Sequence, residues 1–140
     1  MIRKVLLVDD DEDEKALFAE ALAEISPETE CITTSNCVGV LRDLVDQGVQ
    51  LPDVIFLDIN MTPINGWDFL SHFRSLETLD YVPVIIYTTS SHIADHEKAK
   101  QLGAIGLYTK ASDFDEMKES LINILNQVKE DTIVPVFIKQ

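Results

Sequence analysis

The sequence predicts an α/β fold in which parallel strands alternate with helices. Short apolar runs recur along the 140 residues, and longer stretches with a helical period separate them. This alternation is typical of repeated βα units around a parallel sheet. We predict five such units in one domain, because a chain of this length can bury one core and leaves little for a second.

The first two units are predicted between residues 4 and 48. A strand over Lys4–Val8 precedes a helix over about Glu12–Ile25, which Pro27 closes. The apolar residues expected on one buried face of that helix are Ala16, Leu17, Ala21, Leu22 and Ile25. A second strand follows at about Glu30–Thr34. Asn36 is a suitable N-cap for a second helix, which ends near Asp46, before Gly48.

The central strand, Asp53–Leu57, is apolar at nearly every position, as expected for a strand that is buried on both faces. A third helix begins near Gly66, and its apolar residues are Trp67, Leu70 and Phe73. Pro83 opens the fourth strand, where its missing N–H does little harm.

The last unit follows a helix over about Ser91–Leu102 that ends at Gly103. A fifth strand is expected at about Ile105–Thr109, and Ser112 is a suitable N-cap for the final helix. The residues that this helix is expected to bury are Met117, Leu121, Ile124, Leu125 and Val128.

The charge of the chain excludes several classes of function. With 25 acidic and 11 basic residues, the formal net charge is -14, which would repel nucleic acids and anionic lipid headgroups. The apolar run that follows Arg3 and Lys4 is too short for a signal peptide or a membrane span. We therefore expect a cytoplasmic protein that contacts neither nucleic acid nor membrane.

Polar side chains follow four of the predicted strands, at the point where each strand ends. Asp9 and Asp10 follow the first strand, Asp58 the third, Thr88 ends the fourth and Lys110 follows the fifth. The carboxyl ends of parallel strands meet at one edge of a sheet, so these groups should share one pocket. Gathered carboxylates repel one another unless a cation or a proton relieves the repulsion, and Mg²⁺ is the natural candidate because it prefers oxygen ligands of this kind. The lysine and the hydroxyl would then contact the oxygens of a transferred phosphoryl group.

These residues, in this order and at these intervals, resemble the receiver domain of two-component response regulators, in particular the single-domain regulators of chemotaxis. The resemblance covers about residues 2–129, and the receiver domain is expected to span residues 1–130. It implies a flavodoxin-like, doubly wound sheet of five parallel strands in the order 2-1-3-4-5, flanked by five helices. It also implies that Asp58 accepts the phosphoryl group, assisted by Thr88 and Lys110. Mg²⁺ would be held by Asp10, Asp58 and the backbone carbonyl of Asn60, with Asp9 acting largely through a metal-bound water.

The resemblance further implies a stand-alone regulator whose donor is a sensor histidine kinase or a histidine phosphotransfer protein. Residues 131–140 would be an apolar extension without an output domain, so the signal would pass to a downstream protein target. The expected protein is a monomer or weak dimer, and it is no enzyme beyond assisting its own phosphorylation and dephosphorylation. The chain departs from the family pattern at one position that matters for signalling. The family often has an aromatic residue on the fifth strand where this chain has Leu107. The adjacent Tyr108 should point to the face of the sheet opposite to Leu107, because strand side chains alternate.

Three alternatives stay open at this point. A pseudo-receiver would bind partners without phosphorylation. The spacing Asp58-x-Asn60-x-Thr62 loosely resembles the nucleophile motif of haloacid-dehalogenase-type phosphatases, with Asn60 in place of the second acid. The segment from His92 to His96 approximates a metalloprotease helix, but a polar helix face is the favoured interpretation, because no acid downstream is suitably placed as a third ligand.

Overall fold

A computed structural model of the chain describes residues 2–36, 39, 42, 51–61, 65–75, 82–89, 93–111 and 113–129. Most of the helix predicted over residues 36–46, the Ser112 cap and the extension at 131–140 lie outside these ranges. At the start of that helix, Asn36 Oδ1 accepts a hydrogen bond from the Gly39 N–H at 2.9 Å, as the predicted cap would.

Five parallel strands form one sheet. They are β1 (Lys4–Val8), β2 (Glu30–Thr34), β3 (Val54–Leu57), β4 (Val84–Thr88) and β5 (Gly106–Thr109). Their order is β2-β1-β3-β4-β5, which confirms the topology that the resemblance implied. Val8 pairs with both Thr34 and Leu57, so strands β2, β1 and β3 end level with one another.

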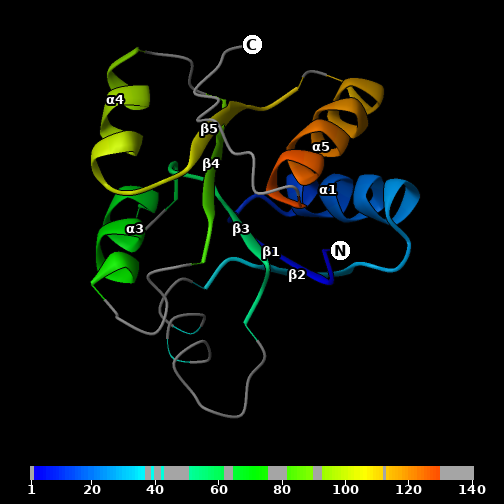
Figure 1. The fold of residues 1–140 in the computed structure, drawn as a ribbon, viewed down its shortest axis with the longest axis horizontal. Coiled ribbons are helices and arrows are strands. Elements are labelled where there is room, and N and C mark those ends of the chain that lie inside the picture. The colour runs from blue at the N-terminus through cyan, green and yellow to red at the C-terminus, as the bar shows by residue number, and fades with distance from the viewer. Residues whose placement is uncertain are drawn as a thin grey trace.

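The described helices cover both faces of the sheet (Figure 1). They are α1 (Glu12–Ile25), α3 (Gly66–Arg74), α4 (Ile93–Gln101) and α5 (Phe114–Lys129). Helices α1 and α5 lie on one face, and α3 and α4 lie on the other. None of the helices in the described ranges is long and apolar enough to cross a membrane.

Each face of the sheet has its own hydrophobic cluster. On the α3 and α4 side, Leu107 packs with Phe73 and Leu70. On the α1 and α5 side, Phe18 packs with Phe56 and Tyr87, and Tyr108 lies against that cluster. Leu107 and Tyr108 therefore face opposite sides, as the alternation of strand side chains predicts.

The buried face that the sequence predicted for α1 is partly wrong. Leu17 is 42% exposed, and Ala16 is also exposed. The helix instead buries Lys15, Phe18, Ala21 and Leu22. Residues 15, 18 and 22 recur at intervals of three and four, so the helix presents this stripe to the sheet and turns Leu17 outward.

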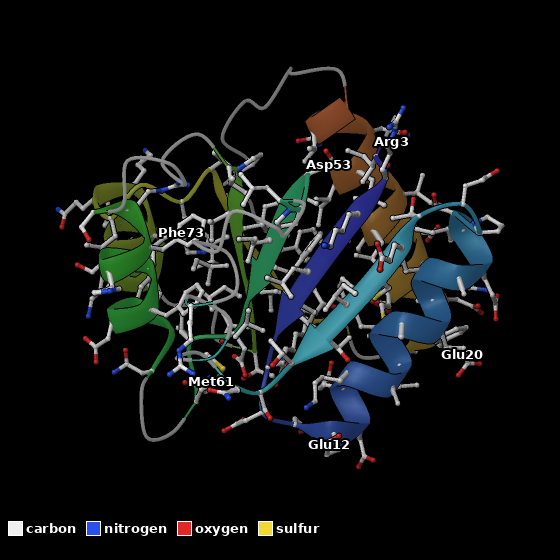
Figure 2. The ribbon with its side chains drawn as sticks, turned by 90° about the horizontal axis from the view of Figure 1, so that it is seen from below. Arg3, Glu12, Glu20, Asp53, Met61 and Phe73 are labelled. Atoms are coloured by element: carbon white, nitrogen blue, oxygen red, sulfur yellow. The ribbon has the colours of Figure 1, made fainter. Side chains whose placement is uncertain are left out.

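The two ends of the sheet carry different groups (Figure 2). Arg3 and Asp53 lie at the amino-terminal end of the strands, where Asp53 Oδ2 accepts from the Arg3 N–H at 2.6 Å. Glu12 and Met61 lie at the opposite end, where the predicted site residues follow the strands.

Arg74 joins the end of α3 to two other segments on the same face. Its Nε and Nη2 donate to the carbonyl of Gly103 at 3.1 and 2.9 Å, and Nη1 donates to the carbonyl of Val82 at 3.0 Å. Gly103 has a φ of 91°, in the left-handed region that favours glycine. The guanidinium thus provides hydrogen-bond donors for one carbonyl just before β4 and one just after α4.

Arg74→Lys is expected to lower the free energy of unfolding by about 1 to 3 kcal/mol, because an ammonium cannot reproduce the planar fork that reaches two carbonyls. Urea denaturation measures the change. Glu97→Ala, an exposed position on α4, is the control and should stay within about 0.5 kcal/mol of the wild type. Equal effects of the two substitutions would show that the Arg74 hydrogen bonds add little to stability.

Candidate functional site

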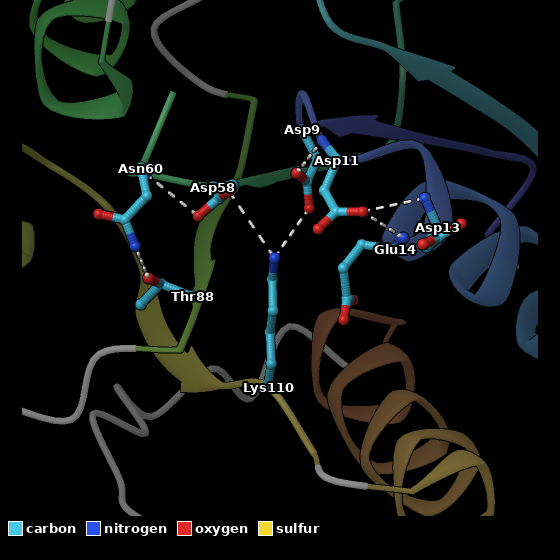
Figure 3. A network of polar contacts seen from close by, with 8 residues as sticks. All are labelled: Asp9, Asp11, Asp13, Glu14, Asp58, Asn60, Thr88 and Lys110. Carbon is cyan, nitrogen blue, oxygen red and sulfur yellow. Dashed lines mark hydrogen bonds and ion pairs between the residues drawn. The ribbon is translucent and has the colours of Figure 1, made fainter. Parts of the chain in front are cut away.

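The carboxyl ends of the strands bring the predicted site residues together, and Figure 3 shows all of them except Asp10. Asp9 and Thr88 are fully buried, Asp58 is 5% exposed, and Asp10 is exposed. Ligand oxygens of Asp9, Asp10 and Asp58 lie within 4.8 Å of one another. Three carboxylates at this separation form a cluster that could hold a divalent cation.

Lys110 supplies the positive charge in this cluster. Its Nζ donates to Asp9 Oδ2 at 2.9 Å and lies 3.7 Å from Asp58 Oδ2, and its side chain is 6% exposed. Burial by itself would lower the pKa of Lys110, but the hydrogen bond to Asp9 and the charge of Asp58 more than reverse this, so the pKa is raised. Lys110 is therefore a buried cation that in this structure joins two acids from different strands.

Burial dominates the electrostatics of Asp58. It raises the pKa of this carboxyl to about 6, although the charge of Lys110 and a hydrogen bond from the Asn60 N–H pull the pKa down. The neighbouring Asp9 carboxylate raises it again. The charged form of Asp58 is thus costly until another positive charge enters the pocket.

Asp58→Asn should stabilise the chelator-treated protein by about 1 to 3 kcal/mol near pH 7, and the gain should disappear near pH 4. The raised pKa means that folded Asp58 holds its proton more tightly than unfolded Asp58. Its contribution to stability is therefore present below the unfolded pKa and is lost as the pH rises through about 6. Urea denaturation of both proteins across this range measures the difference. A difference that does not change with pH would contradict the raised pKa.

Asn60 contacts both Asp58 and Thr88. Its backbone N–H donates to Asp58 Oδ1 at 3.2 Å, and its side-chain amide donates to Thr88 Oγ1, also at 3.2 Å. Asn60 thereby sets the positions of the acid and the hydroxyl. The proposed metal-binding role of its carbonyl stays a prediction.

Asp11 extends the acidic run but belongs to the helix. Its Oδ1 accepts from the N–H groups of Asp13 and Glu14 at 2.9 and 3.1 Å, which makes Asp11 the N-cap of α1. Asp9 Oδ1 in turn accepts from the Asp11 N–H at 2.9 Å. These bonds fix the start of α1 against the pocket.

Sequence reasoning missed three residues around the site. Glu14 lies beside Lys110 from the first turn of α1 (Figure 3), and the Tyr87 ring centroid is 5.8 Å from Lys110 Nζ. Gly66 lies against the backbone of Asp58 and Ile59. The helical pattern places Glu14 in the first turn of α1, and strand alternation places Tyr87 on the α1 side, but neither pattern shows that these side chains lie near the lysine.

The donor set fits a hard divalent cation. The clustered groups are the carboxylates of Asp9, Asp10 and Asp58, and Lys110 is the cation that pairs with two of them. Oxygen-only sites of this type suit Mg²⁺ or Mn²⁺ rather than a soft metal. The arrangement could therefore bind a cation beside a carboxylate nucleophile, with a lysine and a hydroxyl close by.

Comparisons with known proteins agree with this geometry. Among curated proteins, the chain is 29% identical over 117 residues to the regulatory protein AtoC of Escherichia coli (strain K12), which covers 83% of this chain and 24% of AtoC. The chain spans between 24% and 36% of the length of the first curated relatives that it matches.

Solved structures show the same fold. The phosphorylated cyanobacterial phytochrome response regulator RcpA superposes with a TM-score of 0.83 at 24% identity, over 94% of this chain and 96% of RcpA. The Mn(2+)-bound form of response regulator Rcp1 gives 0.76 at 23% identity, over 87% and 91%. The model of the response regulator receiver domain family matches residues 5–122. This chain therefore belongs to the response regulator receiver domain family.

Proposed function

We propose that this receiver domain accepts a phosphoryl group on Asp58 from a phosphohistidine, with Mg²⁺ as its cofactor. The observation that carries the proposal is the contact of Lys110 with both Asp9 and Asp58 inside a cluster of three carboxylates. A structural ion pair needs one acid, whereas a phosphoryl site needs a nucleophile, a cation site and a separate positive group. The pocket supplies all three.

In the proposed reaction, an oxygen of Asp58 attacks phosphorus in line with the bond to the donor nitrogen. The new P–O bond forms as the P–N bond breaks, and the leaving imidazole nitrogen is left neutral or takes up a proton. Lys110 would neutralise the charge on the phosphoryl oxygens, and the Thr88 hydroxyl would donate to one of them. Mg²⁺, held by Asp9, Asp10, Asp58 and the Asn60 carbonyl, would shield the attacking carboxylate from the incoming phosphoryl charge.

The donor that fits this chemistry is a sensor histidine kinase or a histidine phosphotransfer protein. The acceptor of the signal would be another protein, because a net charge of -14 disfavours contact with nucleic acid. A receiver that works in the cytoplasm as a monomer or weak dimer is part of the same proposal. We also propose that the protein catalyses no reaction other than the formation and loss of its own aspartyl-phosphate.

Incubation with phosphoramidate or acetyl phosphate, with and without Mg²⁺, tests the proposal. Intact-mass measurement should show one added phosphoryl group with Mg²⁺ present and almost none with a chelator. Asp58→Ala should not be labelled, whereas Asp68→Asn, an exposed acid on α3, should be labelled as the wild type is.

The alternatives give different results in the same experiment. If neither small donor labels the wild type, and a partner kinase also fails, the protein is an interaction module that works without phosphorylation. Repeated turnover of a phosphomonoester would indicate a phosphatase instead. Against that alternative, Asn60 stands where the second acid is needed, and its side chain is engaged with Thr88.

A further inference from the structure

Two buried oxygens, on residues whose side chains flank Lys110, have no hydrogen-bond partner among the described residues. They are Glu14 Oε2 and Tyr87 Oη. Tyr87 is 1% exposed, so its hydroxyl is shut off from solvent. Unsatisfied buried oxygens destabilise a fold, which suggests that each of them gains a partner in another state of the site.

Both groups lie on the α1 side of the lysine. The Tyr87 ring packs against Phe18 of α1, with ring centroids 5.7 Å apart, and against Phe56, at 5.8 Å. Glu14 is one helical turn before Phe18, so the two share a face of α1. Figure 3 shows the Glu14 carboxylate beside the stem of Lys110, and Lys110 Nζ lies 5.8 Å from the Tyr87 ring.

The charges agree with this placement. Burial raises the pKa of Glu14, and the charge of Lys110 is the largest influence that opposes the rise. Burial likewise raises the pKa of Tyr87, and Glu14 is the nearby charge that adds most to that rise. Glu14, Tyr87 and Lys110 therefore act on one another electrostatically although no hydrogen bond joins them in this state.

Lys110 occupies the oxygens that a divalent cation would need. Its ammonium is 2.9 Å from Asp9 Oδ2 and 3.7 Å from Asp58 Oδ2. A cation bound by those carboxylates would repel the ammonium and compete with it for the same lone pairs. Lys110 then needs a new acceptor within reach, inside a pocket that leaves its side chain 6% exposed.

We propose that Glu14 and Tyr87 form a holding site for the Lys110 ammonium, which Lys110 occupies while a divalent cation is bound by Asp9, Asp10 and Asp58. Glu14 Oε2 accepts a hydrogen bond from Nζ, and the Tyr87 ring lines the same space. Lys110 returns toward Asp58 when a phosphoryl group adds negative charge there. Glu14 is thus a positioning residue for Lys110, and this inference rests on the cation site of the proposed function.

Glu14→Gln tests the holding site, with Asp13→Asn as the matched control. Both substitutions remove one negative charge from the first turn of α1, but Asp13 is exposed. Calorimetric titration with Mg²⁺ should show affinity about tenfold weaker for Glu14→Gln, because a hydrogen bond to a charged group is lost, and little change for Asp13→Asn.

Nuclear magnetic resonance of ¹⁵N-labelled lysine side chains gives a readout that is independent of phosphorylation. The Lys110 signal is identified by its loss in Lys110→Arg. In the wild type and in Asp13→Asn, Mg²⁺ should move this signal and leave it sharp, since the ammonium stays buried and hydrogen-bonded. In Glu14→Gln, Mg²⁺ should broaden the signal through rapid exchange with water.

Three results would overturn the holding site. They are a Lys110 signal that Mg²⁺ does not move, a signal in Glu14→Gln that matches the wild type, and equal Mg²⁺ affinities for the two variants. If Mg²⁺ binds and Asp58 is phosphorylated while the Lys110 signal stays unmoved, the holding site fails and the proposed function stands. If the wild type binds no Mg²⁺, both fail.

Discussion

Lys110→Met is expected to lower the free energy of unfolding of the chelator-treated protein by about 3 to 5 kcal/mol near neutral pH. The substitution keeps most of the apolar stem but removes the ammonium that pairs with Asp9 and Asp58. Asp9 is fully buried and Asp58 nearly so, and two buried carboxylates without a cation repel each other. Urea denaturation in the presence of a chelator measures the loss.

The same variant distinguishes a charge effect from a packing effect. Mg²⁺ should restore part of the lost stability, because a bound cation replaces the missing positive charge and stabilises the folded state by mass action. Lys118→Met is the matched control: Lys118 pairs with Glu24 and Asp115 near the surface of α5 and should matter little. If Lys110→Met behaves like this control, the carboxylates are protonated without the lysine, and the ion pairs are weaker than their geometry suggests.

Gly66→Ala is expected to destabilise the protein by about 1 to 3 kcal/mol, although helix propensity by itself predicts a gain. A Cβ on Gly66 would lie 2.5 Å from the carbonyl oxygen of Asp58 and 2.6 Å from the Cα of Ile59. Both are backbone atoms, so no side chain can turn aside to relieve the overlap. The Gly66 N–H also donates to the Ile59 carbonyl at 3.2 Å, which holds α3 against this segment.

The overlap should also slow the phosphorylation of Asp58. A shift of the Asp58 backbone by about 1 Å would misplace the proposed nucleophile, and labelling by phosphoramidate should slow by about 10- to 100-fold. Ser71→Ala, on an exposed position of the same helix, should change neither stability nor labelling. Wild-type labelling by Gly66→Ala would show that the segment after β3 adapts without moving Asp58.

The sequence determined the architecture and the membership of the site. The predicted bounds of β1, α1 and β2 match the structure, and α3 begins at Gly66 as predicted. Strands β3, β4 and β5 each begin one residue later than predicted, and α4 runs from Ile93 to Gln101 where about Ser91–Leu102 was predicted. Short apolar runs and helical apolar patterns encode these elements locally, so they can be predicted from the chain itself. Polar residues at strand ends converge whenever the strands are parallel, which is why the sequence could group Asp9, Asp58, Thr88 and Lys110.

Which of these residues form ion pairs and hydrogen bonds depends on the tertiary structure. The ion pair between Lys110 and Asp9 joins residues that are 101 positions apart, and the hydrogen bond between Asn60 and Thr88 spans 28. Tertiary packing also determines that Lys15 and Phe18 lie on the buried face of α1. It likewise places Glu14 beside Lys110 and Gly66 against the backbone of Asp58. Sequence periodicity gives the face on which a side chain lies, whereas packing between distant segments sets its rotamer, its burial and its partner.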